Sequence, residues 1–332
     1  MHGHTQDNMI EWEGAPDERT GIPIFSLYGE RRSPSDEMLS GVELLVVDLQ
    51  DVGARYYTFT WTMALCMEAC ERLGIAVLVL DRPNPIGGTQ TEGPVMEPAF
   101  SSFVGLHPLP ARHGMTMAEL GKNFASAYYP KLSYDAVTME GWSRSDYFDD
   151  LDLHWVIPSP NMPLVDTAVV YPGMCLLEGT NLSEGRGTTR PFETFGAPWL
   201  DGWKLAAALN DVALPGAHFR PVQFQPTFQK HSGELCGGCF LHVTDRRSYE
   251  PVLGGLAVLR VCARLSDGKF GWKEPPYEYE TEKRPIDILL GKAKLAEQIL
   301  GDEALSELRQ TLIRDEAAFE PARRAASLYP SA

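Results

Sequence analysis

The order of apolar and polar positions predicts alternating strands and helices over the first half of the chain. Residues 42–49 and 75–80 are continuous apolar runs that each lead into an aspartate, as expected for strands buried on both faces of a parallel sheet. Helical periodicity follows each run, at 58–73 and 116–127. Two shorter strands are predicted at 134–139 and 154–157. This β-α-β-α-β alternation indicates an α/β fold with a Rossmann-like parallel sheet.

The pattern changes in the second half of the chain. Helices are predicted at 201–211 and 252–265, and a pair of strands is predicted between them at 219–228 and 235–243. A charged loop rich in Pro and Tyr follows at 274–284, and the last forty or so residues have the composition of helices. We therefore expect two domains, a Rossmann-like catalytic domain at 1–193 and a smaller α+β domain at 194–332.

The charge and hydrophobicity of the chain argue against binding to nucleic acid and against insertion into a membrane. The 332 residues carry a formal net charge of -16, and 44% of them are hydrophobic. A surface this acidic repels phosphate backbones, so nucleic acid is not an expected partner. Membrane insertion is not expected either, because the sequence has no run of about 18 apolar residues. The segment MHGHTQDN lacks the apolar core of a signal peptide, so the residues alone do not indicate the compartment.

The six cysteines do not indicate a metal centre. Cys66 and Cys70 fall on one face of a predicted helix, as small core residues do. The spacing of Cys236 and Cys239 is compatible with a metal or redox role. A structural zinc site needs about four ligands, however, and the sequence contains no second CxxC or HxxxH. The pair also lies in a predicted strand, so we expect it to have no metal role.

Polar residues gather where the predicted strands end. Ligands of parallel sheets bind outside the carboxyl ends of the strands. The candidates from these loops are Asp48, Gln50, Asp51, Arg55, Tyr56, Asp81, Asn84, Arg112, His113 and Asn161. Each has a structural alternative, such as a helix cap for Asp81 or a hydrogen-bonded loop histidine for His113. Together they predict a polar site, because so many buried polar groups are costly unless they pair or meet a ligand.

The densest polar segment is residues 178–193, EGTNLSEGRGTTRPFE. Its candidate site residues are Glu178, Asn181, Glu184, Arg186, Thr188 and Arg190. A nucleotide site is not indicated, because GxGxxG does not follow the first strand and GxxxxGK[ST] is absent. HExxH and GxSxG are absent as well. The remaining chemistry of carboxylates, amides, arginines and tyrosines suits a neutral or acidic sugar, and two carboxyl groups can cleave a glycosidic bond.

Several long motifs in fixed order resemble one family. They are DLQDVGARYYTF at 48–59, DRPNPIGG at 81–88, EGPVMEPAFSSFVGLHPLPARHGMT at 92–116, PSPNMP at 158–163, EGTNLSEGRGTTRPFE at 178–193 and LCGGCFLHVTDR at 235–246. These motifs resemble the NamZ exo-β-N-acetylmuramidases, once catalogued as a domain of unknown function. The resemblance implies a cleft between the two domains and a glycosidase without a metal or nucleotide cofactor. The implied substrate is a peptidoglycan-derived saccharide or muropeptide, from which β-linked N-acetylmuramic acid is released at the non-reducing end. It also implies export to the periplasm or the cell exterior.

The resemblance also implies roles for residues. Glu184 is our first candidate for a catalytic carboxylate, followed by Asp51, Asp48 and Glu92. Arg186 or Arg190 is expected to bind the lactyl carboxylate of the sugar. His2 and the other polar residues named above are expected to bind substrate.

The start of the chain differs from the family pattern. Members usually have a further βα unit and then a Pro-Glu-His-Gly segment, whereas here Met1 precedes His2 and stands where the Glu is expected. We therefore expect one βα unit and one catalytic carboxylate to be missing. Two alternatives remain open, a catalytically impaired muropeptide-binding protein and another cell-wall hydrolase, such as an esterase or amidase, using the same cleft.

Overall fold

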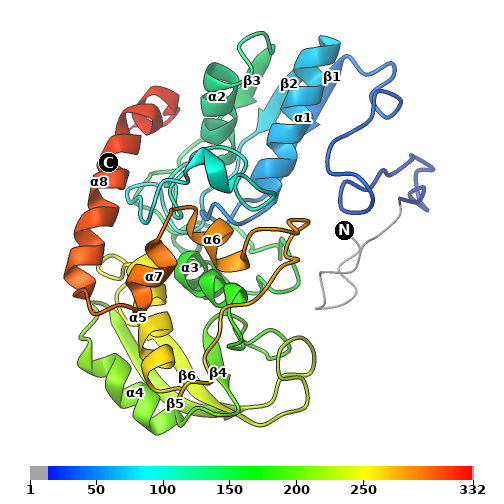
Figure 1. The fold of residues 1–332 in the computed structure, drawn as a ribbon. Helices are drawn as coiled ribbons and strands as arrows, with labels where there is room; N and C mark the ends of the chain where they lie inside the picture. Colours follow the sequence, from blue (N-terminus) through cyan, green and yellow to red (C-terminus); the bar gives the residue numbers. More distant parts are fainter. Residues whose placement is uncertain (1–13, 331–332) are drawn as a thin grey trace.

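The computed structural model describes residues 14–330 and contains two sheets (Figure 1). The first is parallel, with the order β1 (Leu44–Val47), β2 (Ala76–Leu80) and β3 (Tyr134–Val137). Helices α1 (Phe59–Leu73) and α2 (Met117–Ala127) connect these strands. The predicted α/β fold with a parallel sheet is therefore confirmed, and these five elements lie within about two residues of their predicted positions.

Burial of the first strand on both faces was predicted and is wrong for the described residues. Val47 is 5% exposed, whereas Leu44 and Val46, which point to the opposite face, are 47% and 50% exposed. Both β-α-β crossovers move in the same direction across the sheet, from β1 to β2 and from β2 to β3. Because such crossovers share the same handedness, both connecting helices lie on one face of the sheet. The other face of the apolar run at 42–49 is therefore left partly exposed by the described elements.

The start of α2 is fixed to the end of β2 by a capping box and by Asp81. Thr116 Oγ1 accepts a hydrogen bond from the Glu119 backbone N–H at 3.3 Å, and Glu119 Oε2 accepts one from the Thr116 N–H at 3.1 Å. Asp81, which follows β2, accepts a hydrogen bond from the Ala118 N–H at 2.9 Å. Asp81 therefore caps the helix, the structural role that its position allows.

The strand predicted at 154–157 does not form, and that prediction is wrong. Val156 and Ile157 are 78% and 55% exposed, and the segment pairs with no described strand. Trp155 instead packs against Phe148, with ring centroids 4.9 Å apart, and donates from Nε1 to the Met162 carbonyl at 3.2 Å. A short apolar run forms a strand only where a partner strand lies beside it, so the composition of 154–157 alone could not predict a strand.

Helix α3 (Val165–Met174), which was not predicted, continues into the 3-10 helix η3 (Cys175–Gly179). It packs on α5 (Pro251–Arg264) where glycines let the backbones meet. A Cβ on Gly173 would lie 1.8 Å from the Pro251 carbonyl oxygen. This close packing fixes the position of η3, which carries Glu178.

The second sheet is antiparallel, with the order β4, β6, β5. The strands β5 (Ala217–Phe224) and β6 (Cys236–Val243) confirm the predicted pair, whereas β4 (Thr194–Ala197) was not predicted. Helix α4 (Gly202–Asp211) begins after Asp201, whose side chain accepts hydrogen bonds from the first backbone N–H groups of the helix. The free cysteines at 236 and 239 are buried in β6.

The last helices return the chain to the first sheet. They are α6 (Pro285–Leu290), α7 (Leu295–Leu300) and α8 (Leu305–Ala326). Figure 1 shows α3 and α6 between the two sheets and the end of α8 beside α2. None of the described helices is both long and apolar enough to cross a bilayer.

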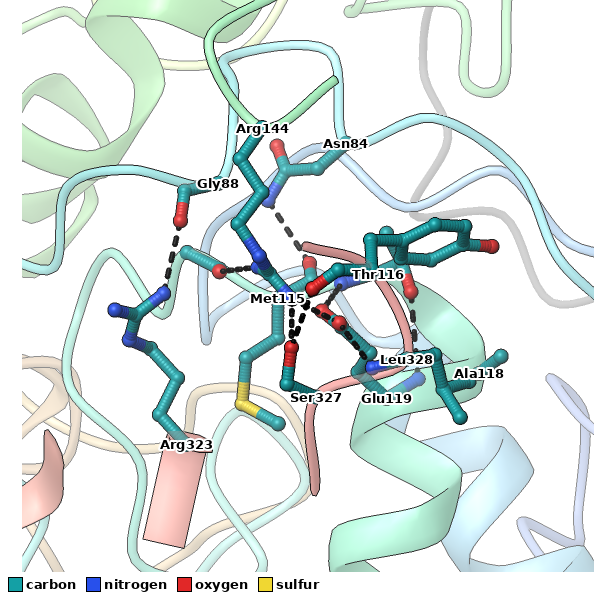
Figure 2. A network of polar contacts seen from close by, with 12 residues as sticks. Asn84, Gly88, Met115, Thr116, Ala118, Glu119, Arg144, Arg323, Ser327 and Leu328 are labelled. Carbon is teal, nitrogen blue, oxygen red and sulfur yellow. Dashed lines mark hydrogen bonds and ion pairs between the residues drawn. The ribbon is translucent and has the colours of Figure 1, made fainter. Parts of the chain in front are cut away.

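A polar network fastens the end of α8 to the start of α2 (Figure 2). Arg323 donates to the Gly88 carbonyl at 2.9 Å, and the Leu328 N–H donates to Glu119 Oε1 at 2.9 Å. Arg144 forms a buried ion pair with Glu119 and donates to Ser327 Oγ at 2.7 Å. The C-terminal segment thus packs against α2, beside the parallel sheet.

Candidate active site

A cavity of about 560 Å³ lies where the loop after β1, the segment around η3 and residues 273–281 meet. Its lining includes four residues predicted to form the site: Tyr56, Asn161, Glu178 and Arg186. Other lining residues that bear polar groups are Tyr28, Tyr57, Thr58, Ser159, Tyr171, Lys273, Tyr277, Glu278, Tyr279 and Thr281. The volume is within the usual range for small-molecule sites, about 300–1,000 Å³.

Glu178 is held at the end of η3 by two partners. Its Oε1 accepts a hydrogen bond from Arg186 NH2 at 2.8 Å, and its Oε2 accepts one from the Tyr277 hydroxyl at 2.5 Å. Burial by itself would raise the pKa of Glu178, but the Arg186 guanidinium and the Tyr277 hydroxyl outweigh it and lower that pKa. Glu178 is therefore an ionised, fixed carboxylate in the cavity wall.

Glu184 lies in the layer behind Arg186. Its Oε1 is 3.6 Å from Arg186 Nε, and its Oε2 is 2.8 Å from Lys230 Nζ. Lys230 also donates to three backbone carbonyls within residues 177–182. Glu184 is 2% exposed and is not among the lining residues of the cavity. Its contacts orient Arg186 and close the 178–186 loop.

Glu278 is a lining carboxylate that was not predicted. It occupies a tight turn in the Pro- and Tyr-rich loop, and burial raises its pKa to about 7, helped by the negative charge of Glu178. Glu178 and Glu278 therefore differ in protonation near neutral pH. The only sequence signal was the density of Pro, Tyr and Glu at 274–280, since no spacing rule relates this segment to 178–193.

Aromatic rings form much of the cavity wall. The Tyr57 and Tyr171 rings meet edge to face with centroids 6.3 Å apart, and Tyr171 packs edge to face on Phe192 at 4.8 Å. Tyr56 also contacts the Tyr171 ring, at 6.4 Å. Aromatic walls with polar edges suit a ligand that is apolar on its faces and hydroxylated at its rim, such as a sugar.

Asp51 and His113 together fix the loop after β1. Asp51 Oδ2 accepts a hydrogen bond from the Gly53 N–H at 2.6 Å and lies 3.2 Å from His113 Nε2. His113 Nδ1 accepts from the Met115 N–H, so a neutral His113 carries its hydrogen on Nε2, facing Asp51. Both side chains are buried away from the cavity lining, whereas Asp48 forms an exposed pair with Arg82.

Glu92, Arg112 and Arg55 join parts of the chain that are far apart in sequence. Glu92 Oε1 pairs with Arg112 NH1 at 2.6 Å, and its Oε2 accepts from the Val252 N–H at the start of α5. Arg55 is fully buried and donates to four backbone carbonyls, at residues 94, 109, 289 and 290. These contacts lie outside the cavity lining and join the loops after the parallel strands to α5 and α6.

Other predicted site residues make local or distant contacts. Side chains that bond nearby backbone or cap an element are Gln50, Asp81, Asn84, Asn181 and Thr188. Arg190 pairs with Glu193 and Asp166 and lines a separate pocket of about 100 Å³. The structure therefore separates Arg190 from Arg186. His2 lies outside the described residues. Among residues 14–330, no group of three or more His, Cys, Asp or Glu side chains is placed to hold a metal ion.

The fold and cavity define a two-part α/β protein equipped for acid–base chemistry on a polar ligand, because its two lining carboxyl groups have pKa values shifted in opposite directions. Sequence models described as the N-terminal and C-terminal domains of exo-beta-N-acetylmuramidase NamZ match residues 1–166 and 169–329. The chain belongs to the NamZ family.

Similar proteins include a named bacterial enzyme. The chain is 51% identical over 249 residues to peptidoglycan beta-N-acetylmuramidase NamZ of Bacillus subtilis (strain 168). The match covers 75% of this chain and 60% of that protein, so the chain spans less than two thirds of its relative.

Two crystal structures of DUF1343 family proteins from Bacteroides fragilis NCTC 9343 share the fold. One is 30% identical with a TM-score of 0.85, and the other is 25% identical with a TM-score of 0.73. Each match covers 95% of this chain and 82% of the other.

Proposed function

We propose that this protein is an exo-acting glycosidase that releases β-linked N-acetylmuramic acid from the non-reducing end of peptidoglycan fragments. The observation that carries the proposal is the cavity, in which two carboxyl groups of opposed pKa lie among tyrosines. Glycosidases need such a pair, one carboxyl group to protonate the leaving oxygen and one to act as an anion. The activity named for the Bacillus subtilis relative supports the choice of substrate.

The test uses the full chain with muropeptides and with short peptidoglycan saccharides. Mass spectrometry should detect free N-acetylmuramic acid and a product shortened by one sugar. Glu178→Gln should lower the rate by a factor of 10² or more. A matched control is Glu274→Gln, which removes the same charge from an exposed residue outside the cavity lining.

Three other outcomes would contradict the proposal. Muropeptide binding without release of sugar would favour the binding protein. Release of peptides or acyl groups, with the glycan intact, would favour an amidase or esterase using the same cavity. Endo-cleavage, seen as fragments of several sugars, would refute the exo mode.

A further inference from the structure

Glu278 occupies a backbone conformation that its residue type disfavours. Tyr277 and Glu280 exchange two backbone hydrogen bonds of 2.9 Å, so Glu278 and Tyr279 are the central pair of a two-residue hairpin. Their φ angles are +45° and +68°, and positive φ at both positions is typical of a type I′ turn. Such turns normally use Asn and Gly. A glutamate and a tyrosine there indicate a position selected for its side chains rather than for its turn propensity.

The surroundings hold this turn against the cavity. The Tyr277 hydroxyl is bonded to Glu178, and the Arg32 guanidinium lies 3.1 Å from the centroid of the Tyr279 ring. Earlier in the same segment, the Lys273 N–H donates to the Gly179 carbonyl at 2.9 Å, next to Glu178. The turn and η3 are thus tied together by backbone and side chains. The carboxyl groups of the two elements enter one cavity from different parts of the chain.

The charges around Glu278 favour its neutral form. Burial is the main cause of its raised pKa, and the Glu178 carboxylate adds to it. The cations that face it, Arg186, Arg32 and Lys273, oppose the shift without cancelling it, and the pKa is about 7. Arg186 is already paired with Glu178 and Glu184, which reduces its effect on Glu278.

We propose that Glu278 is the proton donor of the reaction, a role that rests on the glycosidase function proposed above. Its carboxylic acid protonates the glycosidic oxygen while the bond from that oxygen to the anomeric carbon breaks, and both bond electrons remain on the oxygen. The leaving sugar departs as an alcohol. Water then bonds to the anomeric carbon through its oxygen, and its surplus proton restores the acid form of Glu278. Glu178 remains ionised and faces the positive charge that develops on the sugar ring.

The test compares two substrates of different leaving ability in wild type and Glu278→Gln. A 4-nitrophenyl β-N-acetylmuramide has an acidic leaving group that needs little protonation, whereas the disaccharide with β-1,4-linked N-acetylglucosamine needs a proton. We expect Glu278→Gln to lose 10²-fold or more in kcat on the disaccharide and less than about tenfold on the nitrophenyl substrate. Wild-type activity should fall as the pH rises through about 7, because the acid form is lost. On the nitrophenyl substrate, the pH–rate profile of the variant should lack this fall in activity above about pH 7.

Other results would overturn the role. Equal losses on both substrates, or an unchanged alkaline limb in the variant, would show that Glu278 only positions other groups. NMR titration of ¹³C-labelled glutamate carboxyls, with Glu278 assigned by its missing signal in the variant, should give a midpoint near 7. A midpoint below about 5 would exclude a neutral acid at working pH. A wild-type chain that cleaves neither substrate contradicts the glycosidase function itself. If the wild-type chain is active and only Glu278→Gln departs from the expected results, the proton-donor role alone is contradicted.

Discussion

Lys273 is a cation of the cavity lining that forms no salt bridge with any residue among 14–330. Arg186, the other candidate for an acidic substrate group, already faces the carboxylates of Glu178 and Glu184. Arg190 lies in a different pocket. A lactyl carboxylate that enters the cavity therefore meets, at Lys273, a cation in no described salt bridge, whose ammonium lies 5.5 Å from the centroid of the Tyr277 ring and whose backbone is fixed beside Gly179.

Lys273→Met keeps the length of the side chain and removes its charge. We expect KM for a chromogenic β-N-acetylmuramide to rise on the order of tenfold, because the lactyl carboxylate loses its partner. The matching β-N-acetylglucosaminide, which lacks the lactyl group, should show no comparable change. Lys269→Met, an exposed lysine earlier in the same segment, is the control. Equal increases in KM on both sugars would assign Lys273 a general role and refute lactyl recognition.

At the scale of elements, the joint between α3 and α5 positions the carboxylate end of the site. Gly173→Ala places a methyl group 1.8 Å from the Pro251 carbonyl oxygen, a backbone atom that no side-chain rotation can move away. We expect a loss of about 3 kcal/mol in the free energy of unfolding, measured by urea denaturation. Activity should also fall, because α3 leads directly into η3 and Glu178.

The control for that change is Gly301→Ala, where an added methyl would meet no atom closer than 3.4 Å. This variant should unfold within about 0.5 kcal/mol of wild type. If both alanines cost the same, the close packing of the two helices is not what limits substitution at Gly173.

The elements that were predicted and those that were missed differ in their patterning. Helix α2 has a polar face, so its periodicity located it in the sequence. Helix α3 contains Pro172, and its last eight residues, 167–174, are all buried. A helix without a polar face shows no amphipathic period, which is why it escaped prediction. The strand β4 is four residues long and includes a glycine, too short a signal to detect.

The site could be predicted only in part for a related reason. Glu178 and Arg186 were predicted because they are close in sequence within a dense polar segment. Glu278 and Lys273 reach the same cavity from a loop far later in the chain, and only tertiary packing brings them there. Glu184 and Arg190 do not line this cavity, because the charges of 178–193 pair with each other, with Asp166 of α3 and with Lys230 of the loop between β5 and β6.

At the scale of the molecule, the cavity depends on contacts between the two halves, and Arg55 is central among them. Its guanidinium is fully buried and donates to carbonyls at residues 94 and 109 in the first half and 289 and 290 in α6. No described carboxylate forms a salt bridge with it, and burial lowers the pKa of its guanidinium. Hydrogen bonds to the four carbonyl oxygens offset the cost of burying this charge.

Arg55→Met fills the same space but leaves four carbonyl oxygens without their donor. Each buried group left unpaired costs about 1–3 kcal/mol, partly offset because a cation no longer has to be desolvated, so we expect a net loss of about 3 kcal/mol. Because the lost bonds join α6 to the loops of the first half, calorimetry should show the two halves unfolding in separate transitions. Arg82→Met, which breaks only an exposed pair with Asp48, should change stability by less than about 1 kcal/mol. A single unshifted transition in Arg55→Met would mean that apolar packing alone holds the halves together, and the cavity between them would then not depend on this arginine.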